Sequence, residues 1–161
     1  MSSTTGFLTI PLDAGRVPKT LRGLGDVTAL FDPETGLGGG SSGGIVFAMI
    51  VRVAADDGLA NLGHLGERLA TLPPGQLPAS IGDLEQILER WREQPQEPLR
   101  IAGSDYPPAS EIPALLAQPA SLSPEHEDRD DVPFLIAVLK GHLRVLRAAH
   151  AKGQWVVHAK S

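Results

Sequence analysis

The sequence predicts a single α+β (or α/β) domain in which two strands pack against three helices, and three observations predict it. Residues 45–54 are apolar and β-branched without alternation, as in a strand buried on both faces. Apolar residues recur at spacings of three and four over 59–72, 81–93 and 132–152, which is typical of amphipathic helices. A short apolar run at 154–159 then predicts a C-terminal strand beside the central strand 45–54.

The first 44 residues are predicted to form a glycine-rich N-terminal arm, followed by a globular domain over 45–161. Residues 7–12 alternate as in a strand, but Pro11 cannot donate a ladder hydrogen bond, so an edge or terminal strand is expected. Residues 16–31 have helical spacing that is interrupted by two glycines. Turn-forming residues then lead into a stretch at 38–44 with the composition of a flexible linker.

Prolines set the limits of the elements in the middle of the chain. The helix predicted at 59–72 stops at Pro73 and Pro74, and the next helix is expected to start at Ser80, whose hydroxyl can act as its N-cap. From Pro95 to Pro133 only short elements are expected. They are a strand at 99–102 and a broken helical turn at 111–118.

Both ends of the last predicted helix carry capping signals. Asp131 can act as its N-cap, and Pro133 fits its first turn. Lys152 and Gly153 together form a typical C-terminal signature. The sequence after Pro133 holds no further proline, so this helix is the best-defined element of the chain.

Bulk composition excludes several classes of function. The net charge of −5 argues against a general nucleic-acid binder, because neutralising phosphates requires a basic face. The absence of cysteine rules out disulfides, thiolate metal sites and thiol nucleophiles. The longest apolar run is far short of the roughly 20 residues that span a bilayer, and no Sec-type signal is recognised. We expect a location in the cytoplasm or in a particle assembled inside the cell.

The glycine-rich segment matches G-x-G-x-x-G between Gly38 and Gly43, the fingerprint of dinucleotide-binding loops. The fingerprint requires a strand before it and a helix after it, whereas here a strand is expected to follow. No lysine lies beside it, so a Walker-type phosphate loop is also disfavoured. A connection or a partner-facing loop is the better interpretation.

An acidic run at 125–131 contains five carboxylates, one imidazole and Arg129. Such residues can hold a hard cation, but the glycine and the regular spacing of a calcium loop are missing. Acids that precede a helix also favour its N-terminal dipole. A solvated charge run is therefore expected, and no metal site is predicted.

Histidines offer the remaining chemistry. His64 and Glu67 are one helical turn apart and could share a proton or a metal, although a zincin would need a second histidine four residues from the first. His142 and His150 are eight residues apart on the last helix, with Arg144 and Arg147 nearby. This basic helix face could bind an anionic ligand, or it could be an ordinary solvent face.

The leading hypothesis is a non-enzymatic interaction or structural subunit of a larger bacterial or viral assembly. Its partners would be other protein subunits, including further copies of the same chain, since opposite charge blocks at 125–131 and 140–160 could pair between copies. We predict no catalytic residue and no cofactor. One alternative is a small enzyme or ligand-binding domain that uses a His/Glu or basic-helix pocket, and another is a toxin-neutralising or regulatory binder. The candidate interface residues are Gly38, Gly39, Gly40, Gly43, Tyr106, Arg144 and Arg147.

Overall fold

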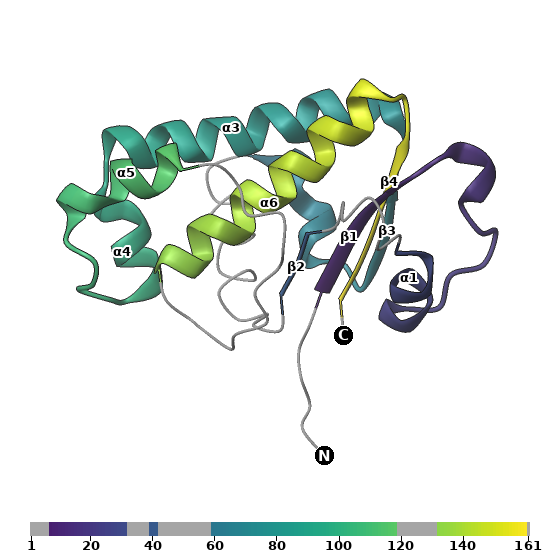
Figure 1. Ribbon diagram of the computed structural model, residues 1–161, viewed down its shortest axis with the longest axis horizontal. Helices are drawn as coiled ribbons and strands as arrows, with labels where there is room; N and C mark the ends of the chain where they lie inside the picture. The colour runs from purple at the N-terminus through teal and green to yellow at the C-terminus, as the bar shows by residue number, and fades with distance from the viewer. Residues whose placement is uncertain (1–6, 32–38, 42–58, 119–131, 161) are drawn as a thin grey trace, which may run out of the picture.

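A four-stranded antiparallel sheet with helices on both faces forms the centre of the molecule (Figure 1). The computed structural model describes residues 7–31, 39–41, 59–118 and 132–160. The antiparallel sheet and the separate helices confirm the predicted α+β domain. None of the helices in these ranges is long and apolar enough to cross a membrane.

The strand order is β2-β1-β4-β3, so the first and the last described strands of the chain lie side by side in the middle. The strands are β1 (Phe7–Leu12), β2 (Gly39–Ser41), β3 (Leu69–Leu72) and β4 (Trp155–Lys160). The α-helices are α1 (Leu24–Leu30), α3 (Leu77–Glu93), α4 (Gln96–Ala102), α5 (Ile112–Ala117) and α6 (Val132–Ala151). Short 3₁₀ helices are η1 (Ala14–Arg16), η2 (Ala60–Gly66), η3 (Pro74–Gln76) and η4 (Ala109–Glu111).

Of the two alternatives predicted for residues 7–12, the edge position is wrong, because β1 lies between β2 and β4. The register explains how this inner strand tolerates a proline. The N–H of Lys160 donates to the carbonyl of Arg68, so the backbone groups of alternate β4 residues, Val156 included, point toward β3. Pro11 is opposite Val156 and therefore turns its missing N–H away from β4. In the part of the chain that the structure describes, β2 pairs with residues 7–9 and does not reach Pro11, so no ladder hydrogen bond between these two strands is lost.

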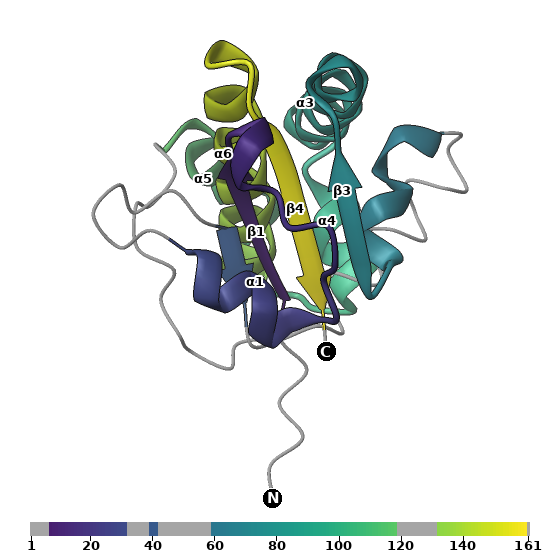
Figure 2. The same ribbon diagram turned by 90° about the vertical axis from the view of Figure 1, so that its right-hand side faces the viewer.

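Each face of the sheet has its own hydrophobic core. On one face α1 covers Ile10, Leu12, Val157 and Ala159, all of which are buried together with Val27 of the helix. On the other face α6 packs against β1, β2 and β4, and α3 packs against α6. Their apolar side chains form a larger cluster that includes Leu72 of β3 and Val156 of β4. Figure 2 shows α1 on the opposite side of the sheet from α6. Ile10, Leu12 and Val27, all from the segment predicted as an N-terminal arm, therefore contribute to the core.

The single helix predicted at 59–72 is wrong, because the segment forms η2 followed by β3. Leu59, Leu62 and Leu65 are buried at a spacing of three, which suits the three residues per turn of a 3₁₀ helix. Leu69 and Leu72 then pack into opposite cores, as an odd spacing requires in a strand. The leucine spacing was compatible with both structures.

The two long helices match their predictions closely. α6 spans almost the predicted residues, and Gly153 just after it has a left-handed φ of 64°. α3 begins at Leu77 rather than at Ser80, because Pro78 fits the first turn of a helix. The Ser80 hydroxyl donates instead to the carbonyl of Asn61 at 2.8 Å, which ties α3 to η2.

The remaining predictions have mixed outcomes. The strand predicted at 99–102 is wrong, since these residues belong to α4, where Gly103 with a φ of 63° forms the C-cap. The broken turn at 111–118 is confirmed as η4 and α5. The strand at 154–159 is confirmed as β4, but its neighbours are β1 and β3 rather than residues 45–54. The segment 45–54, the boundary at residue 44 and the N-cap Asp131 lie outside the described residues.

Candidate functional site

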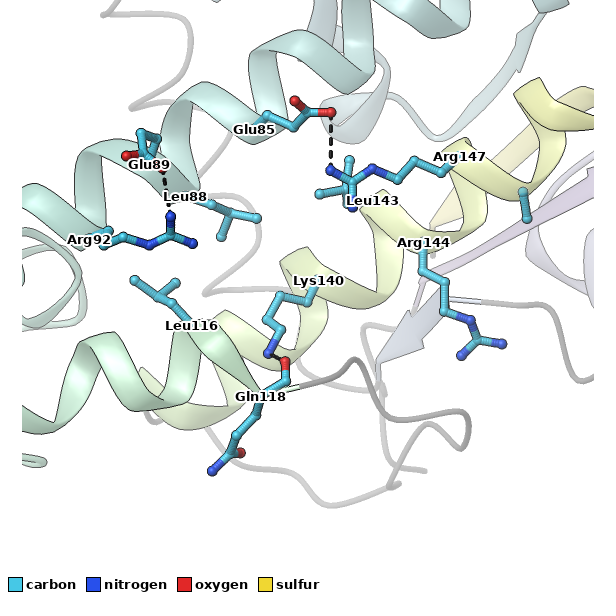
Figure 3. Close-up of a pocket in the computed structure, with 11 residues that line it drawn as sticks. Glu85, Leu88, Glu89, Arg92, Leu116, Gln118, Lys140, Leu143, Arg144 and Arg147 are labelled. Carbon is cyan, nitrogen blue, oxygen red and sulfur yellow. Dashed lines mark hydrogen bonds and ion pairs between the residues drawn. The ribbon is translucent and has the colours of Figure 1, made fainter.

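A groove of about 750 Å³ lies between α3, α5 and α6. Its floor is apolar and is formed by Leu88, Leu116 and Leu143, one from each helix (Figure 3). α3 and α6 pack directly against each other, and α5 packs against both. Packing of three helices therefore holds the groove in place.

Charged side chains also line the groove, four of them cations and two of them carboxylates. They are Arg92, Lys140, Arg144, Arg147, Glu85 and Glu89. Those on α3 are at positions 85, 89 and 92, and those on α6 are at positions 140, 144 and 147. Both sets repeat at spacings of four and three, which places them on one helix face. The groove is thus locally positive in a chain whose net charge is −5.

Two ion pairs in the groove are open to solvent. Arg147 donates to Glu85 at 3.1 Å, and Arg92 donates to Glu89 at 3.0 Å, with all four side chains at least half exposed (Figure 3). Exposed pairs of this kind contribute only about 0–1 kcal/mol. A carboxylate from another molecule could therefore replace Glu85 or Glu89 at small energetic cost.

Lys140 has a structural role in the same groove. Its ammonium donates to the backbone carbonyls of Leu115 at 2.9 Å and of Gln118, at the C-terminal end of α5. Such carbonyls have no partner within their own helix, so a cation there satisfies them. Partial burial lowers the pKa of Lys140. This residue links α5 to α6.

Replacing Lys140 with Met is expected to lower the free energy of unfolding by about 1–3 kcal/mol, because two charge-assisted hydrogen bonds are lost. Urea unfolding measures the change. Lys19→Met is the matched control, since Lys19 is exposed outside any helix and should change stability by less than about 0.5 kcal/mol. Equal losses in both variants would contradict the assigned role.

The predicted interface residues do not form one surface. Arg144 and Arg147 line the groove, although the Arg144 side chain extends from α6 away from α3 (Figure 3). Tyr106 lies between α4 and η4, is 69% exposed and does not line the groove. Gly39 and Gly40 form β2, whereas Gly38, Gly43 and the acidic run 125–131 lie outside the described residues. Arg92 was not among the predicted interface residues, and Lys140 entered only as part of the basic block 140–160. The repeated spacing on α3 and α6 was the signal available for both.

A second polar feature is buried between η2, α6 and the sheet. The Nε2 atoms of His64 and His142 are 3.0 Å apart, and their rings stack with centroids 5.2 Å apart. The His158 ring is edge-on to both of them, and its Nδ1 is 2.8 Å from the Thr9 hydroxyl. We call these three histidines and Thr9 the histidine cluster.

Burial keeps the three histidines neutral. It lowers the pKa of His64 to about 4, against a smaller opposing effect of the Asn61 carbonyl. Burial also lowers the pKa of His158 to about 4, with a further contribution from His64. Burial, followed by the proximity of the other two rings, places the pKa of His142 well below 6.5. The cluster is therefore an uncharged polar network inside the core.

The predicted partnerships of the histidines are not found. His142 is fully buried whereas His150 is exposed, so they do not form a shared face. No hydrogen bond or ion pair joins the side chains of His64 and Glu67. Nε2 of His64 faces His142 and its Nδ1 is buried, so neither nitrogen is presented to solvent. Among the described residues no group of three or more ligating side chains is arranged to hold a metal ion.

Comparison with known proteins adds no relative. No family model, no curated protein and no solved structure matches the chain.

Proposed function

We propose that the protein is a non-enzymatic interaction subunit whose α3–α5–α6 groove binds an acidic, leucine-bearing helical segment of a partner protein. The observation that carries the proposal is the combination of an apolar floor with an excess of cations around it. Amphipathic helices bind in grooves of this kind by inserting apolar side chains. Glutamates on the flanks of such a helix would then meet Arg92 and Arg147.

The alternative of a small enzyme has weaker support. A general base must present a nitrogen or an oxygen to the substrate. His64 lines a second groove, but both of its ring nitrogens are turned away from solvent. The groove between α3, α5 and α6, which we call the cationic groove, has no histidine in its lining. Binding of a partner is therefore the function that the geometry favours.

The test uses a synthetic helical peptide with leucines on one face and glutamates on the other. We expect it to bind the wild-type protein, with an affinity that falls as salt is added. Arg92→Glu combined with Arg147→Glu should weaken binding by about tenfold or more, since two attractive contacts become repulsive. Fluorescence anisotropy of the labelled peptide measures the dissociation constant.

Two controls separate specific binding from general charge attraction. Lys19→Glu combined with Arg22→Glu makes the same charge change on exposed residues outside the groove and should leave the affinity unchanged within about twofold. A peptide with glutamine in place of glutamate should bind about tenfold more weakly. Equal weakening by the two double variants, or no binding of the acidic peptide, would overturn the proposal.

A further inference from the structure

The open edge of the sheet at β3 lies along a second groove. Within the described ranges β3 is the last strand in the order β2-β1-β4-β3, and β4 is its only strand partner there. This groove of about 670 Å³ is lined by all four residues of β3, by η2 and by the start of α3. It is separate from the cationic groove and shares no lining residue with it.

The register shows which backbone groups of β3 face this groove. Because Lys160 N–H donates to the Arg68 carbonyl, Ala70 and Leu72 also exchange their hydrogen bonds with β4. Leu69 and Thr71 alternate with them, so their N–H and C=O groups point to the open edge. No backbone hydrogen bond to either residue is found on that side within the described residues. The edge thus offers two donors and two acceptors in the geometry of a strand.

Small and polar side chains keep this edge accessible. Ala70 and Thr71 lie on the strand, Gly63 on η2, and Gly75 and Ala79 beyond β3, and all five line the groove. None of them is large enough to cover the backbone. Natural edge strands are commonly protected by a charge, a proline or a covering element. In β3 itself none of the four residues is charged or a proline.

We propose that the β3 edge is a peptide-binding site, which takes up an extended basic segment of another protein as an additional strand. Main-chain hydrogen bonds to Leu69 and Thr71 would supply the affinity, as in other cases of strand addition. Glu67 lines the groove and has no ion-pair partner among the described residues. Its carboxylate favours a lysine or an arginine on the added strand. This site is independent of the acidic segment proposed for the cationic groove.

The test uses the capped hexapeptide Lys-Val-Thr-Val-Thr-Lys as the probe, because it combines a strand-forming centre with a cation at either end. We expect binding to slow the hydrogen exchange of the Leu69 and Thr71 amides. The amides of Ala70 and Leu72, which already pair with β4, should change little. A fully N-methylated version of the peptide cannot donate backbone hydrogen bonds, and it should bind about tenfold more weakly or not at all.

Variants at Thr71 provide a test on the protein side. Thr71→Pro removes only the N–H that faces the groove and keeps an extended backbone, so the pairing with β4 remains. It should weaken probe binding by about tenfold or more, whereas the matched control Thr71→Val keeps the N–H and should bind like the wild type. Glu67→Gln should weaken binding by a smaller factor.

Three results would overturn the proposal. They are equal affinity of the N-methylated and unmodified peptides, no added protection of Leu69 and Thr71 at saturating peptide, or unchanged binding by a folded Thr71→Pro variant. The peptide comparison uses the wild-type protein, so it decides the question even if the proline variant does not fold. Because the cationic groove variants Arg92→Glu and Arg147→Glu leave β3 intact, they should bind this probe normally.

Discussion

Lowering the pH from about 7.5 to about 5 is expected to destabilise the fold by about 2 kcal/mol for each of His64 and His158. Both have a pKa of about 4 in the folded protein and a reference value of 6.5. The unfolded chain therefore binds protons at a higher pH than the folded chain. The contribution of the two neutral histidines to the free energy of unfolding is therefore complete above about pH 6.5 and is lost as the pH falls toward about 4.

The surroundings of the cluster explain why protonation is costly. Each ring faces the other two, so a positive charge on one ring makes protonation of the next ring less favourable. Lys160 on β4 adds a further positive charge that lowers the pKa of His158. The carbonyls of Asn61 and Leu65 act in the opposite direction on His64 and His158 respectively, but burial dominates. Because the sites interact, the two losses are not simply additive.

Urea unfolding at a series of pH values measures this effect. The slope of the free energy of unfolding against pH is most informative between about pH 7 and about pH 5.5, because carboxylates titrate mainly below this range. His142→Phe removes one titrating group from the cluster and should make the slope shallower, whatever its effect on stability at neutral pH. A free energy of unfolding that is constant from about pH 7.5 to about pH 5 would contradict the assignment.

Truncation of Trp91 to Ala is expected to lower the free energy of unfolding by about 3–5 kcal/mol. Trp91 lies on α3, is only 2% exposed and belongs to the core cluster that joins α3, α5 and α6. A domain of this kind has about 5–15 kcal/mol of stability in total, so the loss is a large fraction of it. Thermal unfolding should show a decrease in melting temperature of roughly 6–20 °C.

Two further variants on α3 serve as controls. Trp91→Phe keeps an aromatic ring in the core and should cost less than the change to Ala. Glu93→Ala replaces an exposed residue near the end of the same helix, and its effect should stay within about 0.5 kcal/mol. Similar losses for Glu93→Ala and Trp91→Ala would show that Trp91 has no special part in the core.

Local patterns predicted the long helices but not the order of the strands. α3 and α6 have apolar stripes along 17 and 20 residues, and helical patterns of this length are hard to mistake. The run from Leu59 to Leu72 was ambiguous, because a spacing of three fits a 3₁₀ helix as well as an α-helix. The inner position of β1 depends on the direction in which Pro11 faces. That direction is set by pairing with β4, about 150 residues away along the chain.

The candidate sites show the same difference between local and long-range information. Arg144 and Arg147 were identified from a basic helix, but Glu85, the ion-pair partner of Arg147, comes from another helix. His64 was paired with Glu67 in the prediction because they are close in sequence. Its contacts in the fold are His142 and His158, which are 78 and 94 residues away. Each of the three histidines is an isolated residue in its own segment, so no motif marks them.

The adjacency of β1 and β4 has a consequence for the order of folding during synthesis. A ribosome makes residues 7–12 first and residues 155–160 last among the described strands, yet these two strands form the centre of the sheet. Until β4 has emerged, β3 has no strand partner within the described sheet, and β1 can pair only with the three residues of β2. Pairings this distant in sequence slow folding, because a long loop must close before they form. We therefore expect the nascent chain to acquire its helices early and its sheet only once the final strand is released.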